Sequence, residues 1–590
     1  MREEKVTKEN ISQTNRTERN HIEMRMPLEM EREIKKEEIA AYVVNHLPIV
    51  KEFATKLGLV EVINKMMSPC KMEVEPGVIF LGLILDTLSG RTPLYRLDEF
   101  FANQDIELLL DRDVSPEYFA DHNVSRVLDR AHEIGSIKIF TEIAKRGVSI
   151  FGVNTDHVSF DTTSISVFGD YDFGSSGDNG VLNIKHGHSK DHRPDLKQFL
   201  ISMLCVNRNI PVFGQTEDGN ASDKKLNNEV LSSVSKHMAK YGLKPGAFIY
   251  IADSAMVTED NLKVIGDDIR FITRLPATYN ECDRVIKEAV AENQWNDIGV
   301  LAVTKPTKNR PAAYYKSYES EVDLYGKTYR AIVISSSAHD KRRQKRINRE
   351  LKKSQKAIET KCKELEKEEF FCRADAQKAA DKLQSQKSKY YLIKAEVKEV
   401  PKYKKGRPKG GVKEIREMRY VVKATIEEKK EGIEKFRKEA GCFVLISNVQ
   451  KEGEGSYDSR AVLKAYKDQY GIENNFGFLK DPAIVNGIFI KRPERIEVLG
   501  LVLLLSLLIW RLIEYSMRKH VEESGEDLPG WKKARTKRPT SFMLTTKFLG
   551  ITVIKVGNKR ILNKPLTPQQ KEYLNALGVS QETFVNPRDG

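Results

Sequence analysis

Residues 157–170 read HVSFDTTSISVFGD, and this stretch marks the point where the chain changes from helical to strand character. Apolar and polar residues alternate in it and β-branched residues are frequent, which is the pattern of a β-strand. Asp161 lies in the middle of this predicted strand. The apolar stretches that follow, 196–206 and 209–219, are typical of a hairpin with its turn near Asn207. The sheet therefore begins with antiparallel strands.

Strands and helices alternate further along the chain. The run FIYIA (248–252) predicts a buried strand that ends directly before Asp253. Helical periodicity precedes it at 228–242 and follows it at 259–266, and the next strand is expected near 269–276. Antiparallel strands followed by alternating helices and strands indicate an α/β core with a mixed sheet.

The regions on either side of this core differ from it in character. Residues 45–150 show apolar residues at helical spacings, which predicts an all-helical N-terminal domain. Residues 340–388 are highly charged and helical, and two basic strands are expected after them, so we interpret this region as an insertion. The predicted division is a polar tail (1–40), a helical N-terminal domain that is a candidate for DNA contact (41–150), the first part of the core (151–280), the basic insertion (281–440), the second part of the core (441–520) and a C-terminal region (521–590).

Composition narrows the class of protein. The 590 residues carry a net charge of +14 and the pI is about 9.1, which favours a polyanionic partner, either nucleic acid or an anionic membrane surface. Six dispersed cysteines without a C-x-x-C pair argue against a disulfide scaffold or a zinc finger and suit the reducing cytoplasm.

The N-terminus has no apolar stretch typical of a signal peptide. The apolar run 498–510 is shorter than the roughly 20 residues of a membrane span and predicts a buried core helix, with a membrane helix as the alternative.

Two acidic residues stand out because of their neighbours. Asp161 lies inside a strand and Asp253 at the end of one, and burying a carboxylate is costly unless it is paired or binds a cation. Acids on neighbouring strands are able to converge on a divalent metal ion such as Mg²⁺. The alternative is that each makes only local hydrogen bonds.

A polar stripe is expected later in the chain, in AYKDQYGIENNFGFLK (465–480). If this segment is one α-helix, the side chains of four polar residues fall within an arc of about 60°. They are Tyr466, Gln469, Glu473 and Lys480. The alternative is a solvated helix face with a fortuitous pattern.

These motifs carry a resemblance. The order Tyr-x2-Arg-x3-Glu-x6-Lys is the signature of DDE transposases of the IS-four type, and this chain matches it at Tyr466, Glu473 and Lys480, with Gln469 in place of the Arg. FDTTS around Asp161 and ADSAM around Asp253 resemble the family's first and second catalytic motifs. The segment GHSKDHRPDLKQ and the helical region 45–150 are similar to the IS-1634-like branch, and the resemblance covers most of the chain from about residue 45 on.

The resemblance implies a fold and a chemistry. The fold is an RNase H-like catalytic core with an insertion before the helix of Glu473. The chemistry is cleavage of transposon ends and strand transfer into target DNA through hairpin ends, with Asp161, Asp253 and Glu473 holding two Mg²⁺ or Mn²⁺ ions. The family implies a homodimer on DNA in the bacterial cytoplasm. It also implies DNA contacts by Tyr466 and Lys480, and the Gln469 departure weakens the expected charged clamp on DNA.

Other basic and histidine-rich stretches leave alternatives open. The cluster 186–195 is expected to be a structural or DNA-facing loop, with metal ligation as the alternative. KYKKGRPKGG (402–411) resembles an AT-hook core, with Lys405 and Arg407 either contacting DNA phosphates or, in the alternative, reading the minor groove. The runs 341–353 and 531–540 are further candidates for DNA contact.

Three readings of the whole chain compete. The leading one is an active DDE transposase. The second is a DNA-binding protein that descends from a transposase and no longer cuts, which Gln469 favours and the intact set of acids opposes. The third is a structural or membrane-associated helical protein, which leaves the three acids unexplained.

Overall fold

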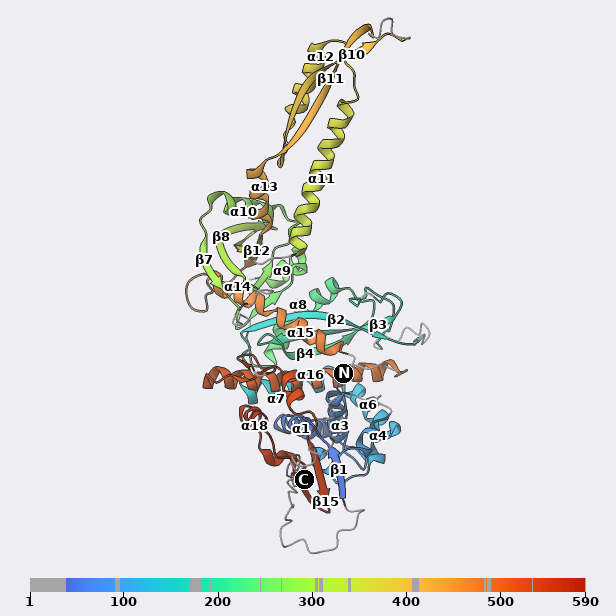
Figure 1. The fold of residues 1–590 in the computed structure, drawn as a ribbon. Coiled ribbons are helices and arrows are strands. Elements are labelled where there is room, and N and C mark those ends of the chain that lie inside the picture. Colours follow the sequence, from blue (N-terminus) through green and yellow to red (C-terminus); the bar gives the residue numbers. More distant parts are fainter. Residues whose placement is uncertain are drawn as a thin grey trace, which may run out of the picture.

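The computed structural model describes most of the chain, and the arrangement is elongated (Figure 1). A helical base, a large sheet and a projecting arm follow one another along the long axis (Figure 1). The described residues are 39–90, 96–169, 171, 182–191, 193–244, 246–266, 268–302, 306, 311–337, 341–405, 413–481, 484, 490–532 and 534–588.

The centre is a nine-stranded mixed sheet. Its spatial order is β4-β3-β2-β5-β6-β12-β9-β8-β7, in which β2, β3 and β4 are antiparallel and β5 and β6 run parallel to β2. The strands are β2 (His157–Val167), β3 (Lys197–Val206), β4 (Ile210–Glu217), β5 (Ile249–Ala252), β6 (Arg270–Arg274), β7 (Asn296–Val300), β8 (Tyr314–Leu324), β9 (Lys327–Ser336) and β12 (Cys442–Ser447). The predicted mixed α/β class is thereby confirmed.

Local sequence explains two features of this sheet. Residues 207–209 join β3 to β4, and Asn207 and Arg208 have φ values of 43° and 77°, in the left-handed region that tight hairpin turns use. The four residues of β5 are all buried, and the strand ends where Asp253 caps a short 3-10 turn, Ser254–Met256, by accepting a hydrogen bond from the Ser254 amide. The acid therefore terminates the apolar strand that precedes it.

Helices cover both faces of the sheet. On one face the apolar side chains of α8, α9 and α10 share a core with Tyr250 and Phe271, and on the other α14 packs on Ile249, Ile251 and Ile272. The helices are α8 (Asp223–Ala239), α9 (Glu259–Ile265), α10 (Asn280–Glu292), α14 (Ser459–Asp468) and α15 (Tyr470–Leu479). This alternation along β5 and β6 follows from the two-residue period of a strand.

The sheet extends into the region that we interpreted as an insertion. Strands β7, β8 and β9 lie beside β12, so residues 296–336 belong to the same sheet as β2. Only the part of the chain after β9 leaves the sheet.

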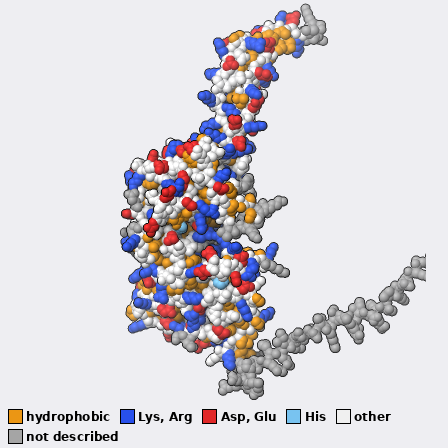
Figure 2. Space-filling model, turned by 90° about the vertical axis from the view of Figure 1, so that its left-hand side faces the viewer, with side chains coloured by type: hydrophobic (Ala, Val, Ile, Leu, Met, Phe, Trp, Pro, Cys, Tyr) orange, Lys and Arg blue, Asp and Glu red, His pale blue; other side chains and the backbone are white. Residues whose placement is uncertain are grey.

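That part forms the arm (Figure 1). Its elements are α11 (Lys341–Leu365), α12 (Arg373–Gln384), the antiparallel pair β10 (Tyr391–Tyr403) and β11 (Ile415–Glu428), and α13 (Lys430–Ala440). Residues 341–440 contain 33 Lys and Arg and 17 Asp and Glu, a net charge of +16 against +14 for the whole chain. Figure 2 shows these basic side chains along the arm with fewer acidic ones between them. The arm thus accounts for the entire basic excess of the protein.

The base is helical, as the periodicity predicted. Its helices are α1 (Leu47–Lys56), α2 (Leu59–Met66), α3 (Pro76–Ser89), α4 (Leu97–Ala102), α5 (Ile106–Leu110), α6 (Asp121–Ile134) and α7 (Ser136–Phe151). The two ends of the described chain meet there, since β1 (Ile39–Val43) pairs with β15 (Thr552–Val556), which in turn pairs with β16 (Lys559–Leu562). The remaining C-terminal elements are β13 (Leu528–Pro529), β14 (Arg535–Thr536), α17 (Ser541–Lys547) and α18 (Pro568–Leu577).

Helix α16 (Pro493–Ser524) joins the base to the sheet. It packs against α3, α6 and α7 on one side and against β4 on the other. It is the one helix in the described ranges that is long and apolar enough to cross a membrane, and 94% of its most apolar window is buried inside the protein. This burial is what the core helix of a soluble protein shows, as the length of the apolar run predicted.

Candidate active site

The sheet places the first two candidate acids level with each other on neighbouring strands. Ser159 of β2 pairs with Ile251 of β5, and Asp161 and Asp253 each lie two residues further on. Because side chains alternate between the faces of a strand and paired strands lie about 4.8 Å apart, both acids lie on the face that α14 covers. The parallel pairing of β2 with β5 is therefore what brings together two acids that are far apart in sequence.

Helix α15 brings the third acid to this place. It packs on β2, and Glu473 lies in its first turn. Partial burial raises the pKa of the Glu473 carboxyl, and the negative charge of Asp253 raises it further. Glu473 thus lies within electrostatic reach of Asp253, and both side chains are exposed to solvent.

Tyr466 lies in the same neighbourhood. Burial raises the pKa of its hydroxyl, the positive charge of Arg274 opposes this rise, and the negative charge of Asp253 adds to it. Arg274 is the last residue of β6, and its side chain lies within electrostatic reach of the Tyr466 hydroxyl. The preceding residue, Thr273, donates a hydrogen bond to the Asp253 carbonyl at 3.0 Å. Arg274 is a basic residue next to the acids that the sequence patterns did not indicate.

Lys480 contacts the loop before β3 rather than the acids. Its ammonium group forms an ion pair with Asp191. In the same loop, Lys190 donates to the carbonyl and the hydroxyl of Thr162 at 2.8 and 2.7 Å, directly beside Asp161. The loop therefore connects the end of α15 to the strand of Asp161, which supports a structural role for this segment.

Metal ligation by that loop gains no support. Within the described ranges, no group of three or more His, Cys, Asp or Glu side chains is positioned to hold a metal ion. Asp195 is paired with Arg193 at 2.7 Å, and His192 lies outside the described residues.

The segment from Tyr466 to Lys480 forms two helices and not the single helix that we expected. The prediction that its polar residues form one continuous stripe is therefore wrong. Helix α14 ends at Asp468 and α15 begins at Tyr470, with Gln469 between them in a helical conformation. At the junction, Gly471 packs against the β3–β4 turn, where an added Cβ would lie 2.7 Å from the Arg208 carbonyl. The close approach of the turn accounts for the glycine.

Gln469 lines a groove whose lining does not include the three acids. This cavity of about 950 Å³ lies between α14, the β3–β4 turn and the C-terminal region. Its basic lining residues are Arg208, Lys464, Lys467, Lys537 and Arg538. The stretch 531–540 that we singled out as basic therefore contributes to the groove beside Gln469, and Arg208 was missed because one arginine in a turn has no sequence pattern.

Gln469→Arg is expected to tighten DNA binding if this groove holds a DNA strand. An added guanidinium that contacts one phosphate steepens the dependence of log affinity on log salt by about 0.9. Fluorescence anisotropy with a labelled duplex at several KCl concentrations measures both quantities. Gln450→Arg adds the same charge at an exposed position outside the groove and is the control. Equal effects of the two variants would contradict a role for the groove.

The remaining predicted DNA contacts lie on the arm. Lys405 is exposed, just beyond the end of β10. Arg407 lies outside the described residues. The arm's net charge is consistent with contact to a polyanion, and the tip of the arm that carries Lys405 is separated by the length of α11 from β2 and α15, the elements of Asp161 and Glu473 (Figure 1).

A buried polar network holds α15 in place. Asn475 is fully buried and donates to the Asn209 carbonyl at 2.9 Å, while its own carbonyl accepts from Arg511 of α16 at 2.7 Å. Arg511 also donates to the Asn474 carbonyl at 2.8 Å and pairs with Glu514 at 3.3 Å. The sequence signal for this network was a single arginine directly after the thirteen-residue apolar run 498–510.

Glu473→Gln is expected to leave the fold at least as stable as the wild type. Since the pKa of Glu473 is raised, the folded state binds its proton more tightly than the unfolded state does, and that contribution to stability is lost as the pH rises through the folded pKa. The variant should therefore show a smaller decrease in Tm between mildly acidic and mildly alkaline pH. Glu523→Gln, at an exposed position on α16, is the control. A steeper decrease in the variant would contradict this electrostatic account.

Comparison with known proteins gives one match. Residues 39–145 match the family model described as a domain of unknown function (DUF4277). This range corresponds to β1 and the helices of the base, from α1 into α7. No curated protein matches the chain.

Proposed function

We propose that this protein is a DDE transposase of an insertion sequence, which cleaves transposon ends and transfers them to target DNA. The observation that carries the proposal is the arrangement of Asp161 and Asp253 at level positions on adjacent parallel strands, with Glu473 brought to Asp253 by α15. The negative charges of Asp253 and Glu473 act on each other, and such a pair of acids favours a bound cation.

The strand order adds support. The segment β4-β3-β2-β5-β6, with three antiparallel strands followed by two parallel ones, is consistent with the RNase H-like core that we propose. In that core the first acid lies on the central strand, the second follows its parallel neighbour, and the third lies on a late helix. The proposed core would then be extended by β12 and β7 to β9 and interrupted by the arm.

The carboxylates suit a divalent cation. Their oxygen atoms are the ligands that Mg²⁺ prefers, and the mutual repulsion of Asp253 and Glu473 would be relieved by a bound cation. The side chains would have to approach one another further to form a complete site, since the described residues contain no preassembled metal group. Two such ions would supply activation of the attacking hydroxyl and stabilisation of the leaving oxygen.

The protein's own residues would then divide the work. Asp161, Asp253 and Glu473 would hold the cations, and Tyr466 would lie beside the scissile phosphate. The groove near Gln469, whose lining has five Lys and Arg beside four Asp and Glu, would bind the DNA backbone through phosphate contacts, and so would the arm. Water would act first at the transposon end, and the freed 3′-hydroxyl would then attack the opposite strand to form a hairpin. We further propose a homodimer on paired ends and a cytoplasmic, nucleoid-associated location.

A second function is favoured by one observation. Gln469 takes the place of an arginine in the signature, and an amide cannot form the bidentate charged contact of a guanidinium. A DNA-binding protein that descends from a transposase and no longer cuts would tolerate this change. It would not need the three acids.

The test is a cleavage assay with the full-length protein. A labelled duplex containing the DNA that flanks the gene is incubated with Mg²⁺ or Mn²⁺, and the products are separated on a denaturing gel. A nick or hairpin at the element's end that requires the metal supports the proposal. Binding without cleavage in either metal would favour the second function, and absence of binding would overturn both.

A further inference from the structure

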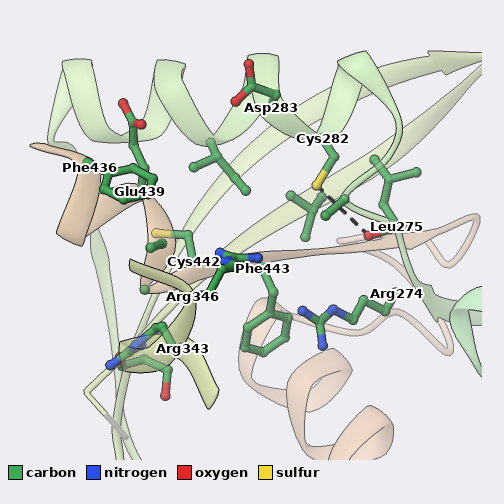
Figure 3. Close-up of a pocket in the computed structure, with 16 residues that line it drawn as sticks. Arg274, Leu275, Cys282, Asp283, Arg343, Arg346, Phe436, Glu439, Cys442 and Phe443 are labelled. Atoms are coloured by element: carbon green, nitrogen blue, oxygen red, sulfur yellow. Dashed lines mark hydrogen bonds between the residues drawn. The ribbon is translucent and has the colours of Figure 1, made fainter. Parts of the chain in front are cut away.

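A separate cavity lies where the arm joins the sheet (Figure 3). Its volume is about 560 Å³, within the usual range for ligand sites of roughly 300–1,000 Å³. We term it the arm-base pocket. Its walls come from the end of β6, from α10, from the first turns of α11 and from the junction of α13 with β12. Both the sheet and the arm therefore contribute to one cavity.

Three arginines give the pocket a positive side. Arg274 belongs to β6, and Arg343 and Arg346 lie in the first two turns of α11. Figure 3 shows the three guanidinium groups below the carboxylates of Asp283 and Glu439. Asp283 is already paired with Lys287 outside the pocket. The positive charge of the arginines is therefore only partly offset.

Local contacts hold two of these arginines at the wall. The guanidinium of Arg274 lies over the Phe443 ring at 5.3 Å, and Arg343 donates to the Ser336 carbonyl at 3.2 Å. Burial raises the pKa of Cys442 to about 11 and also raises the pKa of Cys282, so both thiols stay neutral at pH 7. No thiolate therefore compensates the arginines.

Arg274 relates the pocket to the surroundings of the acids. It lines the pocket, its positive charge counteracts the raised pKa of the Tyr466 hydroxyl, and its chain neighbour Thr273 donates a hydrogen bond to the Asp253 carbonyl. Arg274 therefore lies between the candidate active site and the arm-base pocket. A polymer held at the acids would reach the pocket by way of Arg274.

We propose that the arm-base pocket binds the sugar-phosphate backbone of the DNA strand that extends from the candidate active site, with Arg274, Arg343 and Arg346 as phosphate contacts. The inference rests on the proposed function. Guanidinium groups form strong, bidentate contacts with phosphates, and such contacts position a duplex without reading its sequence. Because the walls of the pocket come from both the sheet and the arm, the bound strand would also set the direction of the arm relative to the sheet.

The experiment compares two arginines of one helix in the full-length protein. Arg346 lines the pocket and Arg349, one turn further along α11, does not, and both are exposed. Arg346→Gln and Arg349→Gln therefore remove the same charge from the same helix. Affinity for a fluorescein-labelled duplex from the gene's flank is measured by anisotropy at several KCl concentrations, with the metal-dependent cleavage assay run in parallel.

We expect Arg346→Gln, but not Arg349→Gln, to make the decrease of log affinity with log salt less steep, by about 0.9 for one lost phosphate contact. Arg343→Gln is a second variant and should act like Arg346→Gln. If the wild type binds and cleaves DNA, and Arg346→Gln and Arg349→Gln have the same salt dependence as each other, the pocket proposal is overturned while the proposed function stands. If the wild type does not bind DNA, the proposed function fails and this inference fails with it.

A free nucleotide offers the same phosphate chemistry as a DNA strand, so ATP is the comparison ligand. Millimolar ATP should displace the duplex from the wild type only weakly, because ATP can form only some of the phosphate contacts that the duplex forms with the protein. If Arg346→Gln instead lowers ATP affinity and leaves the DNA salt slope unchanged, the pocket serves free nucleotides and the proposal is overturned.

Discussion

Asp161→Asn should reduce metal-dependent DNA cleavage by at least about a thousandfold, because the charge stabilisation that the metal ions supply is worth several kcal/mol and each 1.4 kcal/mol is a factor of ten. Asp161 lies in the middle of β2, level with Asp253, so the amide removes a central carboxylate of the proposed set. Asn has nearly the same shape and keeps its oxygen for the Thr162 amide, which donates to Asp161 at 2.7 Å. The fold should therefore be retained.

DNA binding separates this prediction from simple unfolding. The loss of one negative charge near the bound strand should leave affinity unchanged or slightly higher, as an anisotropy titration would show. Asp260→Asn removes an exposed acid from α9 in the same part of the protein and should cleave like the wild type. Cleavage by Asp161→Asn at the wild-type rate would end the proposal that this residue is catalytic.

Arg511→Met is expected to lower the free energy of unfolding by about 3–5 kcal/mol, the usual cost of removing one partner from a buried ion pair. Arg511 is 6% exposed and Glu514 is 4% exposed, and both lie on α16. The substitution would leave the buried Asn475 carbonyl without its donor and would leave Glu514 with Arg518, at 2.8 Å, as its remaining partner on α16. Urea unfolding followed by circular dichroism measures the loss.

Cleavage should also decrease in Arg511→Met, because Asn475 lies two residues after Glu473 and anchors the same helix. Ser506→Ala is the matched control on α16, since the Ser506 hydroxyl is fully buried without a partner in the described structure and its removal should be neutral or stabilising. Combining Arg511→Met with Glu514→Leu should recover part of the stability, because the pair is then replaced as a unit. A fully stable single variant would show that the network does not hold α15.

The candidate site was only partly predictable from the sequence. Asp161 and Asp253 were identifiable because each interrupts or ends an apolar strand, and Glu473 because of the motif around it. Arg274 and Lys190 could not be identified from the sequence, because one basic residue at a strand end or in a loop resembles ordinary surface charge. The continuous helix drawn through Gln469 was wrong because periodicity does not report the hairpin turn that packs against Gly471.

Residue spacing was enough to predict most of the local elements, the mixed α/β class and the core nature of the apolar run in α16, since each depends on residues close together in the chain. The pairing of β1 with β15, in which Val43 lies opposite Thr552, and the addition of β7 to β9 to the main sheet are seen only in the folded protein. The contact of the Asp191 loop with Lys480 is likewise a property of the fold. The physical reason is that strand pairing and ion pairs depend on which surfaces are buried together, and no local pattern specifies a partner hundreds of residues away.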